Sequence, residues 1–232
     1  MYYGYGYMGW YASMIILVPA ILLTIYAQAK VTSNYNKYSQ VMNMRGISGA
    51  QAARIMLDAN GLNHVKINIT SGKLTDHYDP RTQTVTLSTD VYNNASIASI
   101  GVACHECGHA VQHAVRYSPL KLRTFIVPIA SFGSSLAIPL FVFGLILSIE
   151  GLEILGILLF SFAVIFQAVT LPVEFNASRR ALAQMKELGI VMTGEEQGAK
   201  KVLSAAAMTY VAALLMSLLQ LVRLILLSRS RR

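Results

Sequence analysis

The sequence contains few charged residues and almost no cysteine. Only 13% of its 232 residues are Asp, Glu, Lys or Arg, whereas 54% are hydrophobic, and the mean hydropathy is +0.49. This apolar content exceeds what the core of a soluble domain of this length needs, so the composition indicates a membrane protein. A disulfide between the two cysteines, Cys104 and Cys107, would close too small a loop to stabilise a fold. We therefore expect reduced thiols that pack in the interior.

Positive charge exceeds negative charge, but it is not gathered as nucleic-acid binding would require. The formal net charge is +8, and Lys and Arg lie beside apolar segments along the whole chain. Such residues are typical of membrane flanks, so the expected partner is a lipid bilayer and not a nucleic acid. A secretory signal peptide has Lys or Arg before its apolar region, but none precedes the first apolar run of this chain. A retained anchor is therefore favoured, although Ala27-Gln28-Ala29 resembles a cleavage site.

Four apolar runs are long enough to cross a membrane, whose hydrocarbon core needs roughly 20 helical residues. They cover residues 10–29, 124–148, 154–171 and 205–227, and no internal repeat relates them. We predict a mainly α integral membrane protein with about four transmembrane helices. The expected segments are a membrane anchor (1–29) that begins with an interfacial Tyr- and Gly-rich tract, a polar domain (30–123), a transmembrane hairpin (124–171), a short segment (172–204), and a C-terminal transmembrane helix with a basic tail (205–232).

The polar domain has the patterns of a small α/β fold. Ser48 and Gln51 fit a capping box at a helix start, and Gly61 is typical of a helix end. Apolar and polar residues alternate over 65–70 and 84–88, which predicts two strands of a β-hairpin. The polar residues 75–81 between them predict a turn. This α/β surface leads into a helix over residues 96–117.

That helix contains the sequence His105-Glu106-Cys107-Gly108-His109. On an α-helix, residues four apart share one face, so the two imidazoles can bind one Zn²⁺ ion. A carboxylate beside them can accept a proton from the attacking water, which is the arrangement of a metal hydrolase. The alternative is an ordinary helix in which these residues occur by chance.

A catalytic zinc site needs a third protein ligand. His113 lies about 12 Å along the helix from His105, too far to share its ion. Glu174 is the better candidate, because the two intervening spans return the chain to the side that it left. A carboxylate near the bilayer is also costly without a partner. It could instead be a surface neighbour of Arg179 and Arg180, and both interpretations stay open.

Four segments together resemble the YugP-type membrane zinc metallopeptidases of bacteria: 71–82, 85–92, 105–113 and 171–180. The resemblance runs from about Tyr11 to Leu227. It implies a zincin-like domain and a gluzincin-like site, distantly similar to HtpX-type peptidases, with His105 and His109 as zinc ligands, Glu106 as general base and Glu174 as third ligand. The chain departs from the family at Asn176, where Asp is more usual, and at Cys107, and either change could alter the surroundings of the ligands.

We therefore expect a zinc-dependent endopeptidase that hydrolyses membrane or misfolded proteins. A substrate peptide would lie extended beside the strand at 85–88 and bond to its edge. His77 or Tyr78, on the adjacent turn, could donate to the oxyanion, although His77 could instead bond to local backbone.

Two other classes remain open. A zinc-stabilised membrane scaffold would bind partners and cleave nothing, but it has no need of the carboxylate of Glu106. An intramembrane protease of the site-2 type would carry its motif within a span and take a downstream Asp as third ligand, and Glu174 speaks against it.

The positive-inside rule predicts the orientation of a multi-pass protein in the bacterial plasma membrane. The basic groups near 30–37, 116–123 and 179–201 lie on the side of the motif, which places the active site in the cytoplasm. Four spans then put the basic tail outside, which the rule disfavours, so an incomplete last crossing or an inverted orientation stays open. No sequence feature indicates the natural substrate or the oligomeric state.

Overall fold

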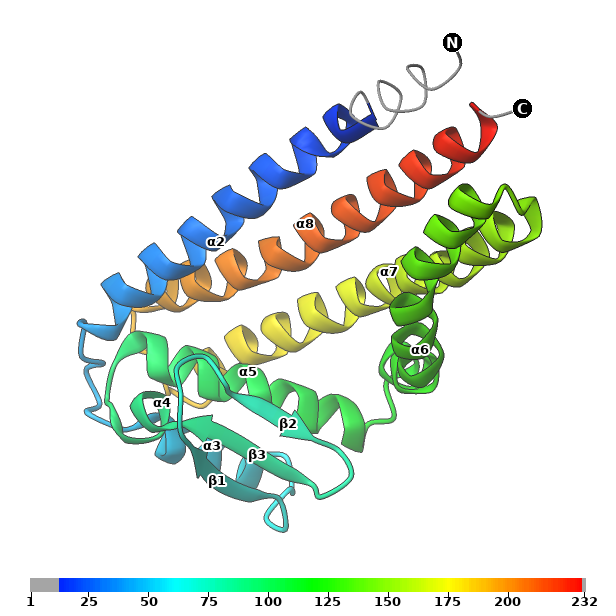
Figure 1. Ribbon diagram of the computed structural model, residues 1–232. Helices are drawn as coiled ribbons and strands as arrows, with labels where there is room; N and C mark the ends of the chain where they lie inside the picture. The colour runs from blue at the N-terminus through cyan, green and yellow to red at the C-terminus, as the bar shows by residue number, and fades with distance from the viewer. Residues whose placement is uncertain (1–12, 231–232) are drawn as a thin grey trace. The chain divides into compact units, whose positions relative to one another are not determined.

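The computed structural model describes residues 13–230, and Figure 1 shows its elements. The chain forms two compact units. One takes in residues 13–26, Lys121–Leu171 and residues 209–230; the other takes in Ala27–Leu120 and Pro172–Met208. The Tyr- and Gly-rich tract that is predicted to lie at the membrane interface falls outside the described residues.

Within residues 13–230, four helices are long and apolar enough to cross a membrane. A 3-10 turn, Ile15–Leu17, leads into α2 (Val18–Ser39), and the other three are α6 (Ser118–Leu147), α7 (Glu150–Glu187) and α8 (Glu196–Arg229). The prediction of a mainly helical membrane protein with four spans is confirmed. The segment boundary expected after residue 171 is not a helix end, since α7 runs through Pro172.

Glycines let α6 and α7 pack closely in the first unit. A Cβ atom at Gly156 would lie 2.7 Å from the backbone oxygen of Ala137, and one at Gly144 would lie 2.6 Å from the backbone nitrogen of Glu153. Later residues of α6 thus meet earlier residues of α7, so the two helices are antiparallel. Small residues at such contacts are typical of helix pairs in membranes.

The second unit contains a three-stranded sheet with the order β1-β3-β2. The central strand β3 (Thr84–Ser88) pairs in parallel with β1 (Lys66–Thr70) and antiparallel with β2 (His77–Asp79). Helices α3 (Gly49–Ala59), α4 (Thr89–Asn93) and α5 (Ile97–Ala114) belong to the same unit. The capping box at Ser48 and Gln51 forms as predicted.

Three expectations about the sheet are wrong. The strands at 65–70 and 84–88 do not form a hairpin with each other, because β1 and β3 are parallel. Residues 75–81 are not only a turn, because they contain β2, which forms the hairpin with β3. The strand at 84–88 is therefore the central strand of the sheet. It has no free edge at the residues that pair on both sides. Three residues of strand are too short to show an alternating pattern, and their main-chain hydrogen bonds leave no mark in the sequence.

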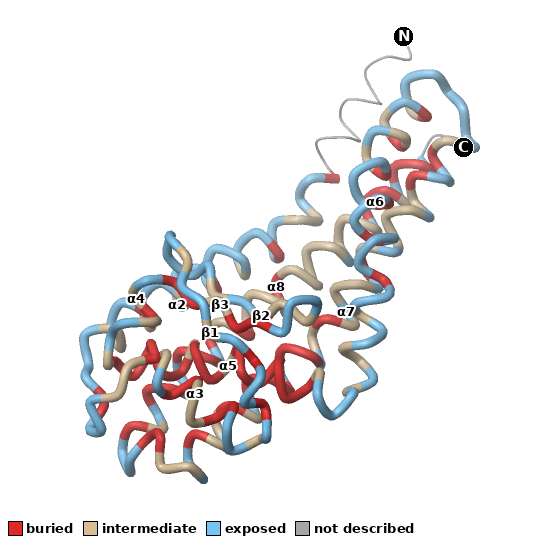
Figure 2. Tube along the Cα trace, turned by 90° about the horizontal axis from the view of Figure 1, so that it is seen from below, coloured by how far each residue is buried: buried red, intermediate tan, exposed pale blue. Residues whose placement is uncertain are grey.

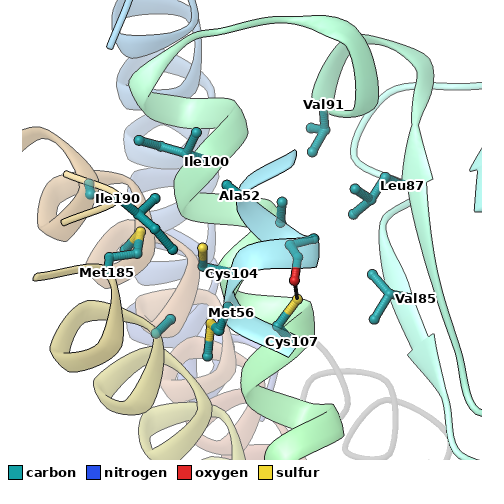
Figure 3. Close-up of a cluster of buried hydrophobic side chains, with 14 of the residues drawn as sticks. Ala52, Met56, Val85, Leu87, Val91, Ile100, Cys104, Cys107, Met185 and Ile190 are labelled. Atoms are coloured by element: carbon teal, nitrogen blue, oxygen red, sulfur yellow. Dashed lines mark hydrogen bonds between the residues drawn. The ribbon is translucent and has the colours of Figure 1, made fainter. Parts of the chain in front are cut away.

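The core of the second unit lies between α3, α5 and the sheet (Figure 3). Its labelled side chains come from several elements, among them Met56 of α3, Leu87 of β3 and Ile100 of α5. Figure 2 shows that buried residues concentrate along α5 and α3. Cys104 and Cys107 are free and fully buried, and burial raises the pKa of the Cys104 thiol to about 12. The prediction that they are reduced packing residues is confirmed.

Candidate metal centre

Helix α5 carries the His-Glu-x-x-His sequence in its buried middle. The Ser96 hydroxyl caps the helix by accepting a hydrogen bond from the backbone N–H of Ser99. Small residues dominate this helix, so neighbouring helices can approach its backbone closely. One turn apart, the rings of His105 and His109 meet edge to face with centroids 4.8 Å apart. The two imidazoles therefore share one face, as their spacing predicts.

Glu174 of α7 meets both imidazoles at the same point. Its Oε2 atom lies 3.3 Å from Nε2 of His105 and 3.5 Å from Nε2 of His109. The three potential ligand atoms lie within 4.8 Å of one another, and Glu174 is only 2% exposed. Two nitrogens and one carboxylate oxygen are a donor set that suits Zn²⁺ and leaves a coordination position for water. The residues present therefore fit a catalytic zinc ion.

A glycine allows α7 to come this close. A Cβ atom at Gly108 would lie 2.6 Å from the backbone oxygen of Ala177, nearer than real Cβ atoms approach. Gly108 precedes His109, and Ala177 lies one helical turn after Glu174. The two helix backbones therefore touch beside the ligand residues.

The Nδ1 atom of each imidazole faces a neutral polar side chain. That of His105 lies 3.1 Å from the hydroxyl oxygen of Ser178, and that of His109 lies 3.0 Å from Oε1 of Gln112. Such contacts leave Nε2 directed at the metal position and hold the ring in place. Neither residue is among those that the sequence motifs single out. Helical spacing could have found them, since Gln112 lies three residues after His109 and Ser178 four residues after Glu174.

The site favours positive charge. Burial lowers the pKa of His109, but the hydrogen bond to Glu174 and the charges of Glu106 and Glu174 outweigh it, so that the pKa of His109 is raised. Glu106 is itself 8% exposed, follows His105 directly in the chain, and its charge acts on His109. A buried centre with two carboxylates suits a cation.

The other candidates lie apart from this cluster. His113 is not among the three grouped residues; its Nδ1 lies 2.9 Å from the hydroxyl of Tyr78 on β2. His77 is exposed, and its Nδ1 lies 2.9 Å from the backbone oxygen of Thr75. This is the contact with local backbone that was the alternative to a role of His77 at the oxyanion. Because side chains alternate along a strand, His77 and Tyr78 point to opposite faces of the sheet, and Tyr78 is the one that faces α5.

Comparison with known proteins identifies the family. Residues 13–229 match the family described as "Putative neutral zinc metallopeptidase". The chain belongs to this family. A relative from Bacillus subtilis (strain 168), described as "Putative membrane protease YugP", is 49% identical over 211 residues, which are 91% of this chain and 94% of the relative. No solved structure matches the chain.

Membership in this zinc metallopeptidase family confirms the resemblance seen in the sequence. Zinc is the cofactor that the family and the grouped side chains of His105, His109 and Glu174 both indicate. The four apolar helices agree with a membrane location, as for the relative.

Proposed function

We propose that this protein is a membrane-embedded zinc endopeptidase that hydrolyses peptide bonds of membrane or misfolded proteins. The observation that carries the proposal is the convergence of His105, His109 and Glu174, with the buried Glu106 directly after His105 in the chain. Membership in a zinc metallopeptidase family supports it. A purely structural zinc site is usually closed by four protein ligands, whereas three are grouped here among the described residues.

In the proposed mechanism, His105, His109 and Glu174 hold the ion. When bound, zinc supplies Lewis-acid activation of a water molecule and of the scissile carbonyl group. The Glu106 carboxylate accepts the proton of the attacking water and passes it to the leaving amine.

We propose that a substrate peptide lies beside β2 and not beside β3. Since β3 is paired on both sides, an extended peptide cannot bond to it along residues 84–86. Strand β2 lies next to β3 and is the last strand in the sheet order, so its outer side is an edge of the sheet. It also contacts α5. We propose that a peptide aligns there. Tyr78 is then better placed than His77 to donate to the oxyanion, because its side chain faces α5.

Replacing Glu106 by Gln tests the proposal. We expect Glu106→Gln to keep stoichiometric zinc and to lose cleavage of an unfolded or membrane-protein substrate by about 10²-fold or more, as for other general bases. Glu196→Gln is the matched control, because the Glu196 side chain is half-exposed and pairs with Lys186. Equal cleavage by Glu106→Gln and the parent would contradict the mechanism. Stoichiometric zinc without any hydrolysis by the parent would favour the scaffold.

A further inference from the structure

One buried glutamine joins the two helices that carry the grouped side chains. Gln112 is fully buried on α5. Its Oε1 lies 3.0 Å from Nδ1 of His109, and its Nε2 donates to the backbone oxygen of Val173 at 2.8 Å and to Oδ1 of Asn176 at 3.0 Å. Val173 and Asn176 flank Glu174 on α7. A single side chain thus contacts one proposed ligand directly and the backbone beside another.

The partners fix the orientation of this amide. A backbone carbonyl only accepts hydrogen bonds, so the Gln112 atom that faces Val173 is the NH₂ group. The Asn176 atom that faces Gln112 is independently identified as the oxygen. The Arg180 guanidinium, which can only donate hydrogen bonds, donates to this atom at 2.8 Å. Both constraints leave Oε1 of Gln112 for His109, whose Nδ1 must then donate. The lone pair of His109 is therefore on Nε2, the atom that faces Glu174.

We propose that Gln112 is a positioning residue of the zinc site. It holds His109 in the tautomer that binds a metal through Nε2, and it sets the distance between α5 and the part of α7 that carries Glu174. The inference rests on the proposed zinc site. It explains how the site can be ordered without a carboxylate on Nδ1 of His109, the partner that metal-binding histidines often have.

The test is the zinc affinity of Gln112→Met, measured by competition with a chelator on the detergent-solubilised full chain. We expect the Kd to rise about 10- to 100-fold, the range for partners of metal ligands. The visible absorption of the Co²⁺-substituted protein should change as well, because the coordination geometry changes. Gln184→Met is the matched control: this amide also joins two helices, through paired hydrogen bonds with Asn60, but lies about 15 Å along α7 from Glu174. Its Kd should stay within about twofold of the parent.

The outcomes separate the inference from the proposed function. A parent that binds no zinc would contradict the proposed function. A parent that binds zinc, with Gln112→Met binding it equally well, would overturn the inference, as would an equal loss in Gln184→Met. If Gln112→Met does not fold, Gln112→Asn carries the test. Asn keeps an acceptor and a donor but is one methylene shorter, so it cannot reach His109 and Val173 at once. Its Kd should therefore also rise, and parent-like affinity would overturn the inference.

Discussion

Glu174 is the residue whose role depends most on its neighbours. In sequence it could be a surface carboxylate near two arginines, but it is almost fully buried and its Oε2 faces the Nε2 atoms of His105 and His109. A buried carboxylate needs a compensating charge. Zinc would provide that charge at the point where Oε2 of Glu174 meets the two Nε2 atoms.

We expect Glu174→Gln to raise the Kd for zinc by more than about 100-fold, beyond the loss typical of a residue that only orients a ligand. Chelator competition measures this, with Glu187→Gln, an exposed position on the same helix, as control. Unchanged zinc affinity in Glu174→Gln would remove it from the ligand set and favour an Asp ligand, as in proteases of the site-2 type.

At the scale of elements, the contact between α5 and α7 brings the site together. Gly108 permits it, because any side chain there would meet the Ala177 backbone. Not every glycine of α5 has this role. A Cβ atom at Gly101, on the same helix, would find its nearest neighbours at 3.9 Å, an ordinary contact distance.

Gly108→Ala should therefore separate the two helices. We expect a loss of about 1–3 kcal/mol in the free energy of unfolding, as for other overpacked sites, and weaker zinc binding. Gly101→Ala should be neutral or stabilising by up to about 1 kcal/mol, since alanine favours helix and the space is available. Thermal denaturation with and without zinc measures both. Similar behaviour of the two variants would show that the close approach at Gly108 does not matter.

At the scale of the whole molecule, four helices are long and apolar enough to cross a membrane, and they predict an even number of crossings between the motif and Glu174. The positive-inside rule predicts that the metal centre lies on the cytoplasmic side. Both native cysteines are fully buried, so they should contribute little background to thiol labelling.

Asp79→Cys should react with a membrane-impermeant maleimide only after the cells are permeabilised, since Asp79 belongs to the unit that carries the metal centre. Ser230→Cys, at the other end of a fourth crossing, should react in intact cells. Labelling of Asp79→Cys in intact cells would invert the orientation. Protection of both positions would mean that α8 does not cross fully.

The sequence by itself determined what depends on local patterns. Uninterrupted apolar runs identify the spans, and the spacing of His105 and His109 places them on one helical face, because both follow from the 1.5 Å rise and the 3.6-residue turn of a helix. The capping box at Ser48 is equally local. The order of the strands, the contact of Glu174 with both imidazoles, and the contacts of Gly108 and Gln112 are visible only in the folded structure. These features depend on contacts between residues more than 60 positions apart in the chain, such as Gln112 and Val173. No sequence periodicity predicts such contacts.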